Sequence, residues 1–404
     1  MTEHTLRIAG PCDTLWPPSV QVHTRLPVSP RPSAFRRRHF PGVPVRDWND
    51  WRWQLRNSFK DLAQLERVLQ LSTKERMGLE AGRQLPTQVT PYYASLLNEA
   101  SPDDPLRRTM VMTTDEFQQS AGEADDPLDE DGDMRAPGIV HRYPDRVLFL
   151  VTPVCPVYCR YCTRSRMVGD PAGHPLGIEQ WRAGIAYIAA HPEIRDVLLS
   201  GGDPLLLADD RLDWLLSQLR AIPHVEVLRI GTKVPVVLPQ RITPSLVRVL
   251  KRYHPFWMSV HFLHPDELTP EVASACARLA NAGIPLGSQT VLLAGVNDDV
   301  ETMKALMRGL MRIRVKPYYL FQCDPVTGTA HFRTPVSTGL DIMRGLRGHT
   351  TGYAVPTFAI DGPGGGGKIP LLPDTMLRRD GDHILLRSFD GKDYRYPDGT
   401  DRCK

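Results

Sequence analysis

The sequence predicts an α/β protein: a partial barrel of six βα units, preceded by a helical region and followed by a small β extension. Beyond residue 147, short runs rich in β-branched and aromatic residues alternate with amphipathic helical patterns at a spacing of roughly 30 residues. Before that point apolar residues recur three or four positions apart, and near the end a strand pattern leads into the turn sequence Asp390-Gly391. Six units are too few for a complete eight-stranded barrel, so the predicted sheet is curled or open.

The N-terminal part divides into two regions. Residues 1–45 contain many prolines and the run Arg36-Arg37-Arg38 without a strand or helix period, so we expect a mobile or extended arm. Residues 46–140 form a predicted helical cap, in which Trp48, Trp51 and Leu55 begin a helical repeat. The acid-rich stretch 121–133 lacks the ligand order of a calcium loop, and we interpret it as a solvated loop without chemistry.

Residues 141–370 are expected to form the core of the fold, and residues 371–404 the β extension. The six strand candidates are residues 147–152, 196–200, 225–230, 257–262, 286–293 and 315–321. Helical patterns lie between them, among them Leu212, Leu215, Leu216, Leu219 and Met303, Leu306, Met307, Leu310. In the extension, the run from His383 to Phe389 predicts a hairpin.

Composition narrows the class of partner. With 49 basic and 46 acidic side chains among 404 residues, the formal charge is +3, which is too balanced to predict nucleic acid or an anionic membrane as a partner. No apolar run approaches the roughly 20 residues of a membrane helix, and the N-terminus lacks a signal-peptide pattern. We therefore expect a soluble cytoplasmic protein that acts on small molecules.

Three of the seven cysteines form a compact motif. Cys155, Cys159 and Cys162 have the spacing Cys-x3-Cys-x2-Cys and directly follow the first strand of the βα series, where such folds place their active sites. A structural zinc site normally has four protein ligands, and no further His or Cys follows at suitable spacing. Three thiolates on a cluster of four irons leave one iron open to an outside molecule. The spacing thus favours a cluster over free thiols or zinc.

This motif resembles the signature of the radical S-adenosylmethionine (SAM) superfamily. The resemblance implies a [4Fe-4S] cluster bound by Cys155, Cys159 and Cys162, with SAM on the open iron. Segments at the ends of later strands also resemble SAM-contacting positions of the superfamily, and the implied residues are Gly201, Gly202, Asp203, His261 and Gln289. Glycines at a strand end allow the backbone to approach a ligand closely.

A glycine run near the C-terminus is the second motif. Residues 361–370 read Asp-Gly-Pro-Gly-Gly-Gly-Gly-Lys-Ile-Pro, with Lys368 directly after the four glycines. The run does not fit a phosphate-binding P-loop, because Ile369 stands where Ser or Thr is required. A flexible linker is the alternative, weakened by the strand-like sequence 353–360 before it. A desolvated lysine amine has a lowered pKa and can form the Schiff base that attaches pyridoxal phosphate (PLP).

The same run resembles the PLP-binding segment of the lysine 2,3-aminomutase family, with Lys368 as the PLP lysine. The resemblance covers residues from about 47 to 390 and includes His141-Arg142-Tyr143-Pro144-Asp145-Arg146, Lys233-Val234-Pro235-Val236-Val237, Gly295-Val296-Asn297-Asp298 and His331-Phe332-Arg333-Thr334-Pro335. It implies that Arg142, Tyr143 and Arg146 hold PLP; without the family, the two arginines fit a surface ion-pair role equally well.

The resemblance also implies a substrate site and a reaction. Arg164 matches the position that pairs with the substrate carboxylate, and Asp324 and Asp361 match the carboxylates that hold the distal ammonium of lysine. Two nearby buried carboxylates resist ionisation unless a cation lies between them, which favours a basic substrate. The implied reaction converts L-lysine to L-β-lysine (3,6-diaminohexanoate). Arginine is the first alternative substrate and glutamate the second, and an inactive iron-sulfur scaffold is the alternative without enzyme activity.

Three further expectations concern partners. The family implies an electron donor such as flavodoxin or ferredoxin and a homo-oligomer. Some members hold a zinc ion with a cysteine directly after Gly-Val-Asn-Asp and a C-terminal cysteine group, but this sequence has Asp299 and only Cys403 at those places. We therefore expect no structural zinc.

Overall fold

The computed structural model describes residues 26–381 and 383–398. Its centre is a ten-stranded sheet in which each strand lies beside the next one in the sequence. The strands are β1 (Met134–Ala136), β2 (Ile139–Tyr143), β3 (Arg146–Thr152), β4 (Asp196–Gly201), β5 (Val227–Thr232), β6 (Phe256–His261), β7 (Leu286–Leu292), β8 (Lys316–Gln322), β9 (Thr357–Gly362) and β10 (Gly367–Pro370).

The seven strands from β3 to β9 are parallel, and the outer strands pair antiparallel. All six predicted strands are present within two residues of their expected bounds. The strand-like sequence 353–360 provides β9, which adds a seventh parallel strand to the six βα units. The α/β partial-barrel prediction is therefore confirmed, and the carboxyl ends of the parallel strands gather at one edge of the sheet.

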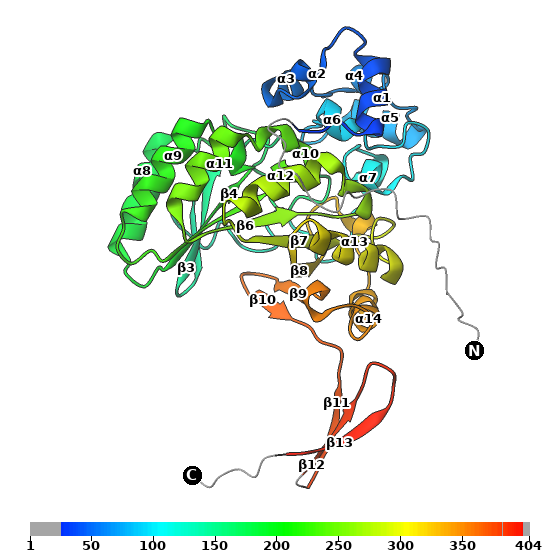
Figure 1. The fold of residues 1–404 in the computed structure, drawn as a ribbon, viewed down its shortest axis with the longest axis vertical. Coiled ribbons are helices and arrows are strands. Elements are labelled where there is room, and N and C mark those ends of the chain that lie inside the picture. The colour runs from blue at the N-terminus through cyan, green and yellow to red at the C-terminus, as the bar shows by residue number, and fades with distance from the viewer. Residues whose placement is uncertain (1–25, 382, 399–404) are drawn as a thin grey trace, which may run out of the picture.

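A helix follows each parallel strand except the last. The principal helices are α8 (Ile178–Ala190), α9 (Asp209–Arg220), α11 (Pro244–Leu250), α12 (Pro270–Asn281), α13 (Val300–Arg312) and α14 (Val336–Leu346), and α10 (Val234–Val237) is a single turn. In Figure 1, α8, α9, α11 and α12 lie along one side of the sheet. The predicted apolar faces of α9 and α13 are buried against the core.

Short 3₁₀ turns occupy several connections. They are η1 (Thr114–Phe117), η2 (Pro204–Leu206), η3 (Pro239–Arg241), η4 (Lys251–Tyr253), η5 (Pro265–Glu267), η6 (Ala330–Phe332) and η7 (Gly352–Ala354). Within residues 26–381 and 383–398, every helix is too short or too polar to cross a lipid bilayer.

The N-terminal region contains α1 (Pro30–His39), α2 (Val45–Trp48), α3 (Trp51–Arg56), α4 (Leu62–Leu65), α5 (Thr73–Ala81), α6 (Pro91–Ala94) and α7 (Pro105–Arg108). The expected extended arm is wrong for residues 30–39, which form a helix anchored by Phe35 against Trp48 and Phe59. Only two residues of α1 are buried, too few to produce a periodic pattern. Residues 1–25 lie outside the described part.

The C-terminal extension is a separate three-stranded antiparallel sheet of β11 (Met376–Asp380), β12 (His383–Arg387) and β13 (Asp393–Pro397). The predicted hairpin is confirmed as the pair β12–β13. The sequence Met-Leu-Arg-Arg-Asp of β11 has no apolar alternation, so this strand was not predicted. Figure 1 shows the sheet projecting from the body of the protein.

Candidate active site

One cavity collects all of the site residues expected from the sequence. It has a volume of about 550 Å³, a typical size for a small-molecule site, and its lining includes residues at the carboxyl ends of the parallel strands. Among its lining residues are Arg142, Tyr143, Arg146, Cys155, Cys159, Cys162, Arg164, Gly201, Gly202, Asp203, His261, Gln289, Asp324, Asp361 and Lys368.

The loop that carries the three cysteines begins where β3 ends and is fastened to the N-terminal region. Gln88 donates from Nε2 to the backbone oxygens of Cys155 (3.0 Å) and Pro156 (3.1 Å). Arg160, within the loop, is buried and donates to both carboxylate oxygens of Glu116 at 2.8 and 2.6 Å. Removing one partner of such a buried pair costs about 3–5 kcal/mol. This pair therefore fixes the loop against the helical region.

The three thiols lie close enough to influence one another. Burial raises the pKa of each, that of Cys162 to about 11. Repulsion from neighbouring thiolates raises the pKa further, by Cys162 at Cys155 and by Cys159 at Cys162. Such a trio ionises together only beside cations, which metal ligation supplies.

The end of β4 approaches the cysteine loop too closely for side chains. Gly201 has φ +112°, and a Cβ there would lie 2.4 Å from the Thr152 carbonyl oxygen. A Cβ on Gly202 would lie 2.4 Å from the Val154 carbonyl oxygen. Glycine at both positions is therefore required to bring the strand end against the loop.

The Asp203 carboxylate is bound by other residues of the protein. It accepts hydrogen bonds from Thr232 Oγ1 (2.7 Å), Lys233 N (2.8 Å) and Val234 N (3.1 Å). Burial raises the pKa of Asp203, whereas these hydrogen bonds lower it. Its carboxylate thus ties the turn after β4 to the turn after β5 and holds the two glycines in place.

His261 and Gln289 face the cavity from adjacent positions on β6 and β7, where they are register partners. Burial and the cations Lys233 and Arg164 lower the pKa of His261 to about 3, so its ring is neutral at pH 7. Lys233 also lines the cavity, and its ammonium pairs with buried Glu267 at 2.8 Å.

The glycine run forms the turn of a hairpin between β9 and β10. Lys368 and Asp361 are cross-strand partners, and the Lys368 ammonium lies 2.9 and 3.1 Å from the two Asp361 oxygens. The Lys368 ammonium also lies 4.8 Å from the centre of the Phe321 ring. The alternative prediction of a flexible linker is wrong, because the run is paired in register.

Opposite edges of the sheet meet at this hairpin. The backbone N–H of Lys368 on β10 donates to the hydroxyl of Tyr143 on β2 at 2.8 Å. Gly367 has φ +71°, and a Cβ there would lie 2.9 Å from the same hydroxyl. Arg146 lies over the Tyr143 ring at 3.7 Å, while Arg142 donates to Asp133 at 2.7 Å. The curled sheet thus brings the lysine and both arginines, distant in sequence, to one wall.

Both predicted substrate carboxylates are influenced by the Lys368 ammonium, which pairs directly with Asp361. Burial and the neighbouring Asp361 raise the pKa of Asp324 to about 7, while the Lys368 ammonium lowers it. The sequence predicts a substrate cation at this pair of carboxylates, and in the structure the cation beside Asp361 is the protein's own Lys368.

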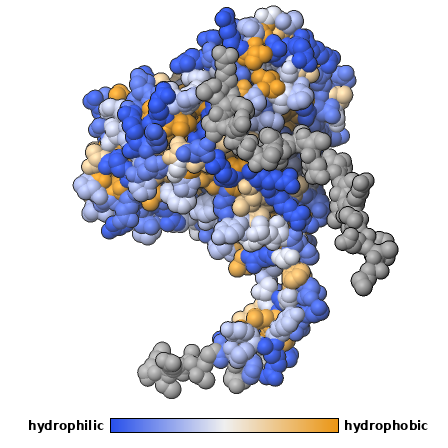
Figure 2. All heavy atoms as spheres, viewed as in Figure 1, coloured by the Kyte–Doolittle hydropathy of each residue, from blue (hydrophilic) through white to orange (hydrophobic). Residues whose placement is uncertain are grey.

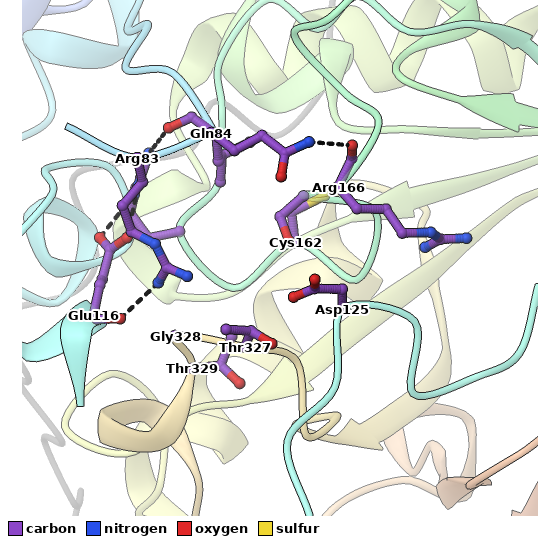
Figure 3. Close-up of a pocket in the computed structure, with 12 residues that line it drawn as sticks. Arg83, Gln84, Glu116, Asp125, Cys162, Arg166, Thr327, Gly328 and Thr329 are labelled. Carbon is purple, nitrogen blue, oxygen red and sulfur yellow. Dashed lines mark hydrogen bonds and ion pairs between the residues drawn. The ribbon is translucent and has the colours of Figure 1, made fainter. Parts of the chain in front are cut away.

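A second, much smaller cavity also reaches Cys162. Its volume of about 40 Å³ suits one or a few water molecules and excludes an amino acid. In Figure 3, Gln84 and Arg166 close one side of it, where Gln84 donates to the Arg166 carbonyl oxygen at 2.8 Å, and Arg83 with Glu116 closes another. The larger cavity is therefore the candidate active site.

Comparison with known protein families matches two parts of the chain that carry site residues. Residues 149–307 match the radical SAM superfamily, and residues 343–404 match a family described as lysine-2,3-aminomutase. The L-lysine 2,3-aminomutase of Clostridium subterminale is 50% identical over 353 residues, which cover 87% of this chain and 85% of that protein. This chain belongs to the lysine 2,3-aminomutase family. The chain contains a radical SAM domain, and the cofactors of the family are a [4Fe-4S] cluster, SAM and PLP.

Two other relatives are named for different substrates, lysine and glutamate. The L-lysine 2,3-aminomutase of Bacillus subtilis is 51% identical over 357 residues, covering 88% of this chain and 76% of that protein. The glutamate 2,3-aminomutase of Clostridioides difficile is 45% identical over 348 residues, covering 86% and 82%.

The cavity of this aminomutase-family protein fits the cofactors of the family. Three mutually repelling thiols suit an iron-sulfur cluster, whose cations stabilise thiolates. Among the described residues, no three His, Cys, Asp or Glu side chains lie close enough together to hold a single metal ion. The ligands of a four-iron cluster bind different irons and therefore lie farther apart. Arg142, Arg146 and the glycine turn suit the phosphate of PLP, and the Lys368 amine faces the same cavity.

The interpretation of the acid-rich stretch 121–133 as a solvated loop holds for its exposed residues but is wrong for Glu130 and for the acids that pair with arginines. Glu130 is only 4% exposed and lines the cavity, where it pairs with Arg164. Asp133 pairs with Arg142, and Arg166 pairs with Asp126 and Asp131. Burial raises the pKa of Glu130, but Arg164, Arg166 and Arg142 outweigh it and hold the pKa below the ordinary value. An acidic run in the sequence does not reveal that Arg164 and Arg166, more than 30 residues later, are its partners.

The position of the zinc ligand in some family members has another role here. Asp299 is the N-cap of α13, and its carboxylate accepts a hydrogen bond from the Thr302 N–H at 2.9 Å. Such a cap stabilises a helix by about 1 kcal/mol. Cys403, the remaining cysteine of that comparison, lies outside the described residues.

Proposed function

We propose that this enzyme moves the α-amino group of L-lysine to the β-carbon and yields L-β-lysine (3,6-diaminohexanoate). The observation that carries the proposal is the acidic pair Asp324 and Asp361, of which Asp361 binds an ammonium, in the same cavity as Arg164. Lys368 cannot serve these carboxylates as an ammonium while it carries a cofactor. A basic substrate would then supply the cation, and its carboxylate would pair with the Arg164 guanidinium.

The other cavity residues would hold the cofactors. We assign Cys155, Cys159 and Cys162 to the cluster, and Gly201, Gly202, His261 and Gln289 to SAM, with Asp203 supporting the turn. Arg142, Tyr143 and Arg146 would hold PLP on Lys368. When bound, SAM and PLP supply the radical chemistry and the nitrogen carrier that the rearrangement needs. The protein contributes by orienting the three ligands and excluding water.

Arginine is the second candidate substrate, because it also brings a cation to the acidic pair. The 45% identical glutamate 2,3-aminomutase belongs to the same family, but glutamate would place a further negative charge beside Asp324 and Asp361. Burial raises the pKa of Asp324, and the neighbouring Asp361 raises it further, so an additional negative charge beside this pair would be unfavourable. We therefore favour lysine over arginine because several similar proteins are named L-lysine 2,3-aminomutase, and we favour both over glutamate by charge.

Asp324→Asn and Asp361→Asn are each expected to lower kcat/KM for L-lysine by about ten- to a hundredfold, because the distal ammonium loses a charged partner. In the wild type, kcat/KM is expected to fall with decreasing pH as Asp324, whose pKa is raised by burial and by Asp361, becomes protonated, and the Asp324 variant lacks this fall. Turnover at several pH values measures both effects.

A matched control is Asp341→Asn, whose side chain is 65% exposed on α14 and pairs with Arg344. It is expected to behave as the wild type. Full activity of both acidic-pair variants on basic substrates, or wild-type preference for glutamate, would contradict the assignment.

We also propose that the protein forms a homo-oligomer in the cytoplasm and takes electrons from flavodoxin or ferredoxin. Met376, Tyr394 and Tyr396 on the projecting sheet are each more than half exposed. Figure 2 includes hydrophobic residues on this projection, and a small sheet with no helix over it is poorly stable alone. Light scattering is expected to give a mass that is a multiple of 45.4 kDa, and a stable monomer would contradict it.

A further inference from the structure

The Arg164 side chain has two edges that can bind a carboxylate, and Glu130 occupies one of them. Arg164 donates from Nε to Glu130 Oε2 at 2.9 Å and from Nη2 to Oε1 at 2.6 Å. This pairing uses the lateral edge of the guanidinium. Nη1 makes only a long hydrogen bond of 3.3 Å to Ser200 Oγ at the end of β4. The terminal edge, formed by Nη1 and Nη2, therefore keeps donors for a second carboxylate.

Glu130 is built into the wall of the cavity. It is 4% exposed, and its neighbours in the loop are tied to distant segments. Ala124 pairs with the segment after β8, donating to Pro325 O at 3.0 Å. Gly364, in the glycine turn, donates to Pro127 O at 3.0 Å. Both hydrogen bonds fix the loop to the segments that carry Asp324 and Lys368. The loop therefore holds Glu130 in a defined position in the cavity wall.

A second arginine, Arg166, also holds Glu130. The Arg166 guanidinium lies 3.7 Å from Glu130 and also pairs with Asp126 at 3.2 Å and Asp131 at 3.0 Å. Glu130 is thus held by two arginines, and a buried carboxylate with such partners keeps a defined orientation.

From this geometry we propose that Glu130 is a positioning residue, which orients Arg164 so that its terminal edge receives the substrate carboxylate. The inference rests on the proposed function, because it takes Arg164 as the carboxylate partner of an amino acid. It adds that the acid-rich loop determines how well that carboxylate is bound. A misplacement of about 1 Å at such a group can reduce binding or rate up to a hundredfold.

The opposite account makes Glu130 a competitor that fills the carboxylate site until substrate displaces it. The two accounts differ in sign. If Glu130 positions Arg164, its replacement weakens binding of the substrate carboxylate. If Glu130 competes, its replacement strengthens that binding.

The test compares L-lysine with 1,5-diaminopentane, which has the same chain and distal ammonium but no carboxylate. Calorimetric titration of the PLP-loaded, cluster-containing protein without SAM gives the two affinities, and their ratio reports the carboxylate contribution. Glu130→Gln, which keeps the length of the side chain and removes the charge, is expected to lower this ratio by about tenfold or more. Asp129→Asn, which likewise replaces a carboxylate by an amide in the same loop but at an exposed side chain, should leave the ratio unchanged.

A double-mutant cycle separates positioning from a general effect on folding. Arg164→Lys removes the fork and should lower the ratio by itself. If Glu130 acts through Arg164, adding Glu130→Gln to this variant lowers the ratio little further. Iron content and melting temperature identify variants that fold. If Glu130→Gln alone is unstable, Glu130→Asp, which keeps the charge but shortens the side chain, is expected to lower the ratio as well.

Each outcome decides between the accounts. An unchanged or increased ratio in Glu130→Gln, with the wild type still favouring L-lysine, overturns the positioning role and leaves the proposed function intact. A wild type that binds L-lysine no better than 1,5-diaminopentane overturns the proposed role of Arg164, and the inference with it.

Discussion

Cys159→Ala is expected to lower the reductive cleavage of SAM by about a thousandfold or more, because removal of a direct metal ligand costs more than the tenfold to hundredfold loss of an outer-shell partner. The structure supplies no spare thiol: the two other buried cysteines of the described residues, Cys276 and Cys323, do not line the cavity. Release of 5'-deoxyadenosine under reducing, anaerobic conditions measures the effect, and iron analysis shows whether the cluster is present.

The matched control for this variant is Cys276→Ala. Cys276 is fully buried in α12, and its replacement tests the general cost of losing a buried thiol without touching the cysteine loop. We expect normal iron content and cleavage. A Cys159→Ala protein that forms 5'-deoxyadenosine at the wild-type rate would refute the cluster assignment.

Lys368→Ala is expected to remove covalently bound PLP and lower amino-group migration by about a thousandfold or more, because the lysine that attaches the cofactor is lost. The Lys368 amine lies on a hairpin whose other strand carries Asp361, and its backbone is held by Tyr143. In the wild type, borohydride reduction followed by peptide mapping should place the pyridoxyl group on Lys368.

Lys316→Ala provides the comparison on a neighbouring strand, since Lys316 begins β8 and does not line the cavity. It should retain PLP and activity. Discovery of the pyridoxyl group on Lys233, which does line the cavity, would sink the assignment of Lys368.

Local patterns in the sequence predicted most of the fold. The strands β3 to β8 each have a run of apolar or β-branched residues of the right length, and the alternation with helices predicted the parallel order. The cysteine spacing, the glycine run and the strand-end residues are also local, and every site residue that the resemblance implies lines the cavity. Family membership confirms the fold and the cofactors.

The remaining features depend on contacts between distant parts of the chain. The helix α1 has only two buried residues, so no periodicity marks it, and Phe35 finds its partners in another region. The link between β2 and β10 requires the sheet to curl, which composition does not encode. The sequence does not distinguish Glu130 from the other acids of its run, because its role depends on contact with Arg164, which lies 34 positions later.

The central claim is a 2,3-amino shift on lysine, and product analysis tests it most directly. Reconstituted enzyme with SAM, PLP and a reductant is incubated without oxygen with L-lysine, L-arginine or L-glutamate, and derivatised products are identified by mass spectrometry. The account predicts L-β-lysine from L-lysine, dependent on both cofactors, with less product from arginine and least from glutamate. Conversion of glutamate in preference to both basic amino acids, or no migrated amino group from any of the three, would contradict it.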